Sequence, residues 1–128
     1  MNKLAPQQKD IEILLVDDQE DILENLKLFL ETEPGLSVVG IAKDGLEALK
    51  KAKQLLPEVI VMDVKMPRMS GVEATRHLRD VYPEMNVILI SMYDDKELIQ
   101  KGKEAGAKSY FLKGTAMQIL IDEIRRLS

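Results

Sequence analysis

Five side chains in this 128-residue sequence are of types that can handle a metal ion and a phosphoryl group. Three are carboxylates: Asp17 and Asp18 stand together in "LLVDDQ", and Asp63 follows the apolar run "VIVM". The other two are the hydroxyl of Ser91, in "ILISMYDD", and the amine of Lys113, in "GAKSYFLKG". Each of the five ends or follows an apolar run, so each is expected where a strand ends.

Three carboxylates brought together repel one another, so either some of them bind protons or a cation lies among them. The chain has no Cys and one His, which leaves oxygen atoms as the main ligands and favours a hard cation, Mg²⁺ or Mn²⁺. A lysine beside them supplies a positive charge for a phosphoryl oxygen, and a hydroxyl can bond another. The set therefore predicts a site for a phosphoryl group bonded to, or resting on, Asp63.

The elements that must position these side chains are five apolar strand candidates with helical patterns between them. The strands are expected at 11–16, 36–42, 58–62, 86–91 and 109–112. Four are nearly continuous Val, Ile, Leu and Met runs, typical of strands buried on both faces. The alternation predicts an α/β fold: a (βα)5 doubly wound, three-layer sandwich around a five-stranded parallel sheet. Right-handed crossovers place every strand's carboxyl end at one edge, where open α/β sheets bind ligands.

Residue patterns also mark where the helices begin and end. A capping box places a side-chain acceptor at the helix start and Glu or Gln three residues later. The expected pairs are Ser70 with Glu73, Thr115 with Gln118, Asp44 with Glu47, and Asp94 with Glu97. Glycine or proline follows four of the helical runs, as expected at helix ends, at Gly35, Pro57, Pro83 and Gly106.

Composition narrows the classes of function. Hydrophobic residues make up 45% of the chain, enough for the core of one domain of this length. The absence of Cys excludes disulfides, thiolate metal sites and a cysteine nucleophile, and it fits a cytoplasmic location. A net charge of −4 without a Lys/Arg-rich run argues against nucleic-acid binding by this chain alone.

The start of the chain shows no targeting signal. Residues 1–10, "MNKLAPQQKD", lack the apolar region of a signal peptide, and we expect a disordered lead there before a single domain at 11–128. No apolar run approaches the ~20 residues that a membrane span needs, so no membrane partner is expected.

Taken in order, "LLVDDQ", "VMDVKMPRMSGVEA", "ILISMYDD" and "GAKSYFLKG" resemble the receiver domain of bacterial two-component response regulators, the CheY-like fold. The resemblance covers roughly residues 11–127 and is closest to the subgroup that carries a LuxR-type helix-turn-helix. It implies the strand order 2-1-3-4-5. It also implies a signalling switch rather than an enzyme: a sensor histidine kinase donates the phosphoryl group, and transcription is controlled through a DNA-binding domain outside this chain.

The same resemblance implies roles for individual residues. Asp63 would be the phosphoacceptor and Lys113 the lysine that accompanies it. Asp18 would bind Mg²⁺ directly and Asp17 largely through water, with the backbone carbonyl of Lys65 completing the protein ligands.

The resemblance also implies a signalling surface. Ser91 would bond the arriving phosphoryl group, and Tyr110, in "SYFLK", would move inward behind it as the switch aromatic. The surface of the fourth helix, fifth strand and fifth helix would change, with phosphorylation-dependent homodimerisation there or at a neighbouring face. One residue departs from the pattern: Gly114 stands where many receivers have a proline joined by a cis peptide. A cis bond is less favourable without proline, which leaves the path of this loop open.

Lys65 and Tyr93 are expected to influence how long the phosphoryl group persists. They lie two residues after Asp63 and Ser91, where they would flank the approach of a hydrolytic water. Neither side chain is a good general base at neutral pH, so we expect slow self-dephosphorylation. The alternative is that both side chains point to solvent and have no effect.

Simpler structural interpretations exist for several of these residues. Asp17 and Asp18 also fit a helix N-cap pair, Ser91 a strand-end hydroxyl, and Tyr110 a half-buried strand aromatic. His77, the only histidine, falls on a polar helix side and is expected to be solvated.

Three other functions compete with the signalling switch. A hydrolase with an aspartyl nucleophile, like the haloacid dehalogenases, would carry D-x-D after its first strand, whereas here Asp17 and Asp18 are adjacent. A flavin-binding protein would carry a Ser/Thr/Gly-rich phosphate loop at that position, and an acidic edge disfavours the flavin phosphate. A docking module that ignores phosphate would not need the five side chains together.

Overall fold

The computed structural model describes residues 9–128. Residues 1–8, most of the expected lead, lie outside the described part, and Lys9 and Asp10 are exposed coil before the first strand. The elements are β1 (Ile11–Val16), α1 (Glu20–Glu31), β2 (Leu36–Ala42), α2 (Gly45–Leu55), β3 (Val59–Asp63), α3 (Gly71–Val81), β4 (Asn86–Ser91), α4 (Lys96–Ala105), β5 (Ser109–Leu112) and α5 (Met117–Leu127).

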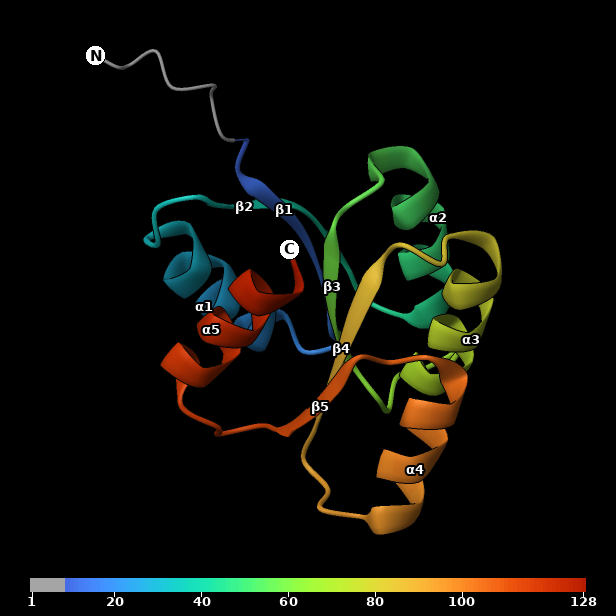
Figure 1. Ribbon diagram of the computed structural model, residues 1–128. Helices are drawn as coiled ribbons and strands as arrows, with labels where there is room; N and C mark the ends of the chain where they lie inside the picture. Colours follow the sequence, from blue (N-terminus) through green and yellow to red (C-terminus); the bar gives the residue numbers. More distant parts are fainter. Residues whose placement is uncertain (1–8) are drawn as a thin grey trace, which may run out of the picture.

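The five strands form one parallel sheet in the order β2-β1-β3-β4-β5, shown in Figure 1. This confirms the predicted fold class and strand order. Four strands have the predicted bounds, and β3 lies one residue later than expected, so that it includes Asp63. The acidic residue therefore belongs to the strand and is held by its ladder.

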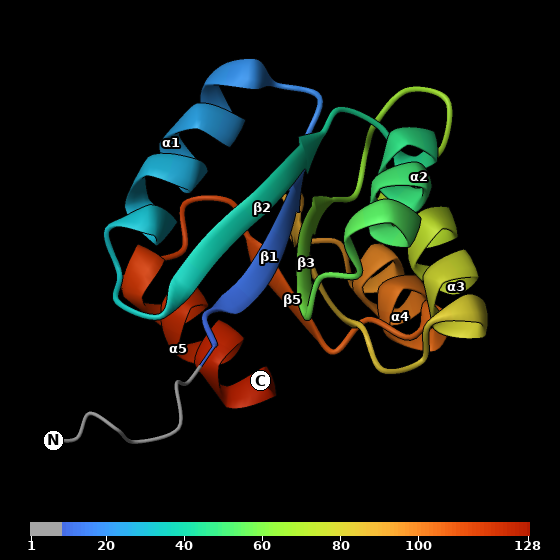
Figure 2. The ribbon, with the colours of Figure 1, turned by 90° about the horizontal axis from the view of Figure 1, so that it is seen from above.

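The helices form layers on both sides of the sheet. Figure 2 shows α1 and α5 against one face and α2, α3 and α4 against the other. Each side has its own buried cluster, because alternate residues of the central strands point to opposite faces. On β3, for example, Val59 and Val61 pack toward α1 and α5, whereas Ile60 and Met62 pack on the opposite side.

Two of the four expected caps are confirmed. Ser70 and Asp44 accept the backbone N–H groups of Glu73 (3.1 Å) and Glu47 (2.8 Å). At α4 the prediction is wrong by one residue, because Asp95 and not Asp94 caps the helix.

At α5 the expected cap is also wrong. The helix begins at Met117 after Ala116, with no side-chain cap. Thr115 instead donates its N–H to the Leu112 carbonyl (3.1 Å) in the turn around Gly114, whose φ of +94° requires glycine. All peptide bonds of residues 9–128 are trans, including the one after Lys113.

Within residues 9–128, no helix combines the length and apolar character that crossing a membrane demands.

Candidate functional site

The parallel register brings the predicted side chains to one edge of the sheet. Asp17 follows the strand residue that pairs with Met62, so it lies beside Asp63. Ser91 comes one residue after the partner of Asp63, and Lys113 comes one residue after the partner of Ser91. Four of the five side chains therefore stand at the carboxyl ends of four adjacent strands.

The three carboxylates form a cluster, and Lys113 contacts two of them. One oxygen each from Asp17, Asp18 and Asp63 lie within 4.8 Å of one another. Asp17 is fully buried, Asp63 is 6% exposed, and Asp18 faces solvent. The Lys113 ammonium lies 2.8 Å from Oδ2 of Asp17 and 3.4 Å from Oδ2 of Asp63, so it bridges the two buried carboxylates.

Burial and neighbouring charge act on these groups in opposite directions. Burial, and then the negative charge of Asp17, raise the pKa of Asp63, although Lys113 works against both. Burial alone would lower the pKa of Lys113, but its close pairing with Asp17 and the charges of both carboxylates outweigh it and raise that pKa. The lysine therefore stays charged, while one negative charge at Asp63 is poorly compensated.

The residues present fit a divalent cation. Oδ1 of Asp17 accepts the N–H of Gln19 (2.9 Å), but the buried Oδ2 makes no well-directed hydrogen bond even though the Lys113 ammonium is close. An incompletely satisfied buried oxygen, two further carboxylates within reach and a solvent-facing Asp18 make a donor set of oxygen atoms alone. Such a set suits Mg²⁺ or Mn²⁺.

Ser91 lies at the buried end of β4. Its Oγ accepts the N–H of Tyr93 (3.0 Å), and its carbonyl accepts the N–H of Lys113 (2.8 Å). Tyr110 is half-buried; its ring lies close to Gly102 of α4, and its hydroxyl donates to the Tyr93 carbonyl at 3.4 Å. The structure therefore brings the two predicted switch residues to the same loop.

Lys65 and Tyr93, the two residues expected to influence lifetime, contact each other. The Lys65 ammonium lies 4.3 Å from the centroid of the Tyr93 ring, a cation–π geometry, and both side chains are exposed. The loops after β3 and β4 are thus joined by this contact.

The sequence did not reveal one ion pair near the cluster. Asp44, expected only as a helix cap, is buried and also accepts hydrogen bonds from the Arg68 guanidinium, with Nε at 3.0 Å. These residues are 24 positions apart, and no local pattern signals such a contact. His77 is exposed, as expected.

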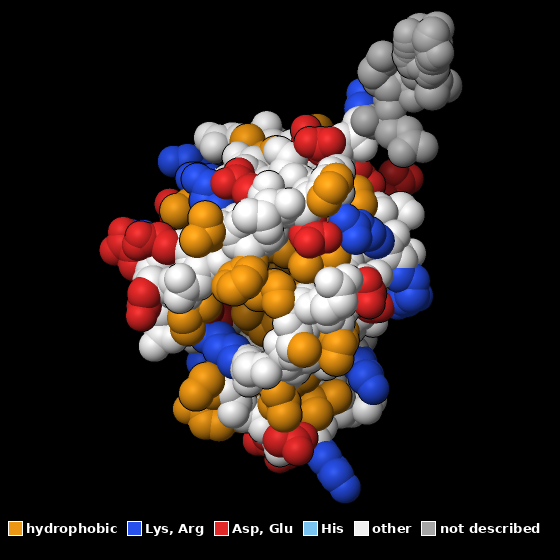
Figure 3. All heavy atoms as spheres, turned by 90° about the vertical axis from the view of Figure 1, so that its left-hand side faces the viewer, with side chains coloured by type: hydrophobic (Ala, Val, Ile, Leu, Met, Phe, Trp, Pro, Cys, Tyr) orange, Lys and Arg blue, Asp and Glu red, His pale blue; other side chains and the backbone are white. Residues whose placement is uncertain are grey.

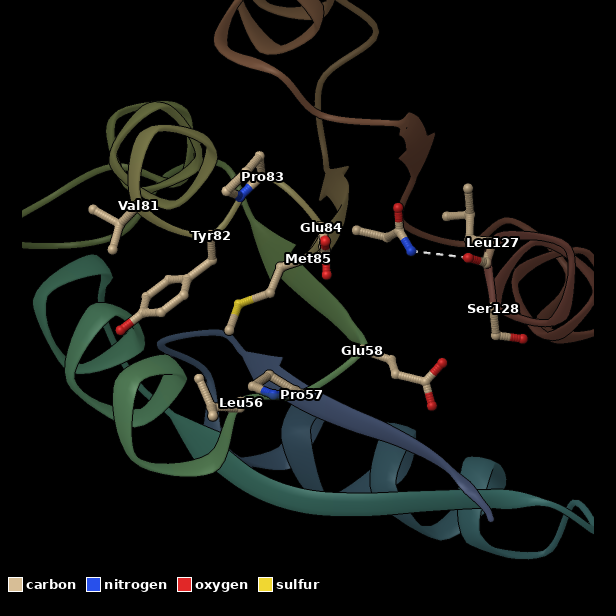
Figure 4. Close-up of a pocket in the computed structure, with 11 residues that line it drawn as sticks. Leu56, Pro57, Glu58, Val81, Tyr82, Pro83, Glu84, Met85, Leu127 and Ser128 are labelled. Atoms are coloured by element: carbon tan, nitrogen blue, oxygen red, sulfur yellow. Dashed lines mark hydrogen bonds between the residues drawn. The ribbon is translucent and has the colours of Figure 1, made fainter. Parts of the chain in front are cut away.

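A hollow lies at the opposite edge of the sheet, before β3 and β4 begin. It has a volume of about 670 Å³ and is shown in Figure 4, where Tyr82, Met85, Pro57 and Glu58 stand around it. The Asn86 amide closes one side by donating to the Leu127 carbonyl (2.8 Å). None of the five predicted side chains lines it, so the chemistry is assigned to the carboxyl edge.

Comparison with known proteins agrees with the site. Residues 13–125 match the family model of the response regulator receiver domain. The transcriptional regulatory protein DegU of Brevibacillus brevis is 35% identical over 125 residues, which are 98% of this chain and 52% of DegU. This chain spans about half the length of the curated relatives it matches.

Solved structures agree as well. A LuxR-family two-component response regulator from Aurantimonas sp. SI85-9A1 superposes with a TM-score of 0.88 at 31% identity, covering 93% of this chain and 85% of that one. The CheX-CheY-BeF3-Mg²⁺ complex from Borrelia burgdorferi gives a TM-score of 0.86 at 23% identity, over 93% and 90% of the two chains, and shares the fold. The expected likeness to LuxR-type regulators is confirmed. With its family match, predicted topology and acidic cluster, the chain belongs to the response regulator receiver domains of two-component signalling.

Proposed function

We propose that residues 11–128 form a receiver domain in which Asp63 accepts a phosphoryl group from a sensor histidine kinase. The observation that best supports this is the Lys113 ammonium between the buried carboxylates of Asp17 and Asp63. A carboxylate with a raised pKa and a neighbouring lysine, at the carboxyl edge of a parallel sheet, supports a role for Asp63 in nucleophilic attack on phosphorus.

In the reaction, an Asp63 oxygen forms a bond to phosphorus while the bond from phosphorus to the kinase's histidine nitrogen breaks. Lys113, already charged, balances negative charge on a phosphoryl oxygen. Asp17, Asp18, Asp63 and the Lys65 carbonyl would hold Mg²⁺ or Mn²⁺, which supplies charge neutralisation when bound, as phosphoryl transfer requires. The Mg²⁺ of the Borrelia burgdorferi complex supports this choice of metal.

We propose that the new charge switches the loop after β4. An aspartyl phosphate adds roughly two negative charges beside groups that are already acidic. Ser91 would exchange its bond from the Tyr93 N–H for a hydroxyl bond to the phosphoryl group, and Tyr110 would turn inward. Because α4 buries only Gly102 and Ala105 of its own residues, few buried contacts would oppose a shift of the helix with that ring.

Signalling would follow from the altered surface of α4, β5 and α5, or from a neighbouring face. Figure 3 shows apolar side chains gathered over α1 and α5, where a hollow of about 240 Å³ is lined by Phe29 and Leu112 among others. Both side chains are exposed. Phosphorylation would raise self-association, and sedimentation of the fully phosphorylated domain at high concentration tests this; an unchanged sedimentation coefficient contradicts it.

The output would be transcription in the cytoplasm, through a DNA-binding domain outside these residues. DegU, named as a transcriptional regulatory protein, supports this output, as does the greater length of the curated relatives.

The decisive experiment is labelling with acetyl phosphate and Mg²⁺, followed by intact-mass measurement. The chain should gain one phosphoryl group that hydroxylamine removes, and Asp63→Asn should gain none while remaining folded. Asp80→Asn, which changes an exposed carboxylate on α3, is the matched control and should label fully. Stoichiometric, hydroxylamine-sensitive labelling of Asp63→Asn would refute the assignment.

A further inference from the structure

The loop between β3 and α3, residues 64–70, carries an unusual backbone conformation. Arg68 has φ +67°, in the left-handed region that residues with a Cβ seldom occupy. Such a conformation persists where surrounding contacts hold it, and it is common at functional sites. The loop begins directly after Asp63 and includes Lys65.

A buried carboxylate holds this conformation from α2. Oδ2 of Asp44 accepts hydrogen bonds from Nε (3.0 Å) and Nη2 of Arg68, and Oδ1 accepts the N–H of Glu47 (2.8 Å). The Asp44 side chain is 3% exposed, whereas that of Arg68 is 69% exposed. The hydrogen bond from Glu47, reinforced by Arg68 against the cost of burial, lowers the pKa of Asp44. One carboxylate thus caps α2 and fastens the loop.

Backbone contacts fasten the loop at two further points. The Gly45 N–H donates to the Met69 carbonyl (3.2 Å), and a Cβ on Gly45 would come within 2.5 Å of that oxygen. At the base of the loop, the Gly71 N–H donates to the Val64 carbonyl (2.8 Å). A Cβ on Gly71 would overlap the Asp63 carbonyl oxygen. Both glycines allow close approach, so the loop has little room to shift.

We propose that Arg68 is a positioning residue for the divalent cation, acting through Asp44. By holding its own backbone against the start of α2, it fixes the loop so that the Lys65 carbonyl is ready to complete the oxygen ligands. This inference rests on the proposed function of the acidic cluster. It adds to that site a residue, Arg68, that would not touch the metal and would act through its ion pair with Asp44.

Charge and position predict opposite effects for one substitution, which makes the proposal testable. Removing the positive charge of Arg68 near an acidic site should strengthen cation binding if only the net electrostatic field matters. If the ion pair holds the ligand loop in place, the same substitution should weaken cation binding. The loop would then lose conformational freedom when the cation binds, and that entropy cost opposes binding. Asn is the replacement of choice, because it tolerates positive φ and cannot span the distance to Asp44 as Arg does.

The test compares Arg68→Asn, Asp44→Asn and the double variant by calorimetric titration of the whole chain with Mg²⁺. Asp44→Asn keeps an N-cap side chain and loses the ion pair. Each single variant should weaken Mg²⁺ binding about threefold to tenfold, in the range for loss of a charged, two-donor contact. The double variant should match the singles, because all three lose the same contact.

Arg125→Gln is the matched control, because it removes one positive charge and the ion pair with Glu33 (3.1 Å) without touching the loop. It should leave Mg²⁺ affinity unchanged. In the metal-free chain, amide hydrogen exchange in residues 65–69 should be faster in Arg68→Asn than in Arg125→Gln. If the parent binds Mg²⁺ and Arg68→Asn binds it equally or more tightly, the positioning role is refuted and the proposed function is not. A parent that binds no Mg²⁺ overturns the proposed function and, with it, the effect on affinity.

Discussion

Replacing Asp63 by Asn should make the metal-free protein more stable at pH 7. Burial, and then the charge of Asp17, raise the pKa of Asp63 above its ordinary 3.8. The folded state therefore binds more protons than the unfolded state at pH values between 3.8 and the folded pKa. Stability falls as pH rises through that window, and above it the full cost of the buried charge is present.

The distances allow the repulsion and attraction acting on Asp63 to be compared with the cost of its burial. At an effective dielectric constant of about 20, carboxylate oxygens within 4.8 Å repel by at least about 3.5 kcal/mol, and an ammonium at 3.4 Å attracts by about 5 kcal/mol. Repulsion by Asp17 thus offsets most of the attraction by Lys113, and the cost of burying Asp63 remains. Asn has the same shape and no charge, so we expect a gain of about 1 kcal/mol.

Urea denaturation at pH 7 with a chelator measures this gain. With a denaturant slope of about 2 kcal/mol per molar, the midpoint of Asp63→Asn should lie about 0.5 M above that of the parent. The difference should vanish below pH 3.8, where Asp63 is protonated in both states. Mg²⁺ should reverse the order, because a ligand at a hundred times its Kd stabilises the parent by about 2.7 kcal/mol.

Asp80→Asn, remote from the acidic cluster and exposed, should shift the midpoint by much less. A lower midpoint for Asp63→Asn than for the parent, in chelator at pH 7, would refute the reasoning. It would mean that the attraction of Lys113 for Asp63 exceeds the cost of burial and of repulsion by Asp17.

Three further predictions concern the metal, the lifetime and the acid stability. Asp18→Ala should weaken Mg²⁺ binding more than Asp17→Ala in calorimetric titration, because exposed Asp18 is free to bind directly whereas Asp17 is already paired with Lys113; equal losses would contradict that distinction. The double variant Lys65→Asn, Tyr93→Glu should lose its phosphoryl group faster than the parent, since it replaces the cation–π pair with groups that can orient water; a decay no faster than the parent's would show that shielding is absent. Hydrogen bonds from Arg126, and also from Ser109, lower the pKa of Glu123 to about 2, so its stabilisation is complete above 4.5 and is lost as the pH falls to about 2. Because the Arg126 side chain is 65% exposed, this loss of stability should be under about 1 kcal/mol. The urea midpoints of the parent and of Glu123→Gln should converge as the pH falls through that range. Midpoints that stay equally far apart at every pH would contradict the assignment.

Residue types and short-range patterns were enough to predict most of the fold. The central strands β1, β3 and β4 are buried on both faces and are almost wholly apolar, so they could be located from their apolar runs alone. The caps at Ser70 and Asp44 were predicted correctly because a cap is a contact between residues three positions apart. The same rule was wrong at α4 and α5, where the preceding loop decides which residue is placed to cap.

The sequence also predicted which residues form the acidic cluster and what they would bind. Asp17, Asp18, Asp63, Ser91 and Lys113 follow the strands, and parallel topology with right-handed crossovers brings such residues to one edge. Their types indicate a hard cation and a phosphoryl group without any knowledge of distance.

Only the tertiary structure decided how those groups are charged, paired and held. Asp17 and Asp63 are buried while Asp18 is exposed, and Lys113 bridges the buried pair. These relations depend on which side of each strand end faces the core. The contacts of Arg68 with Asp44 and of Lys65 with Tyr93 join residues 24 and 28 positions apart, on different loops. A contact between distant loops depends on how both loops are folded over the sheet, and no periodicity along one segment carries that information.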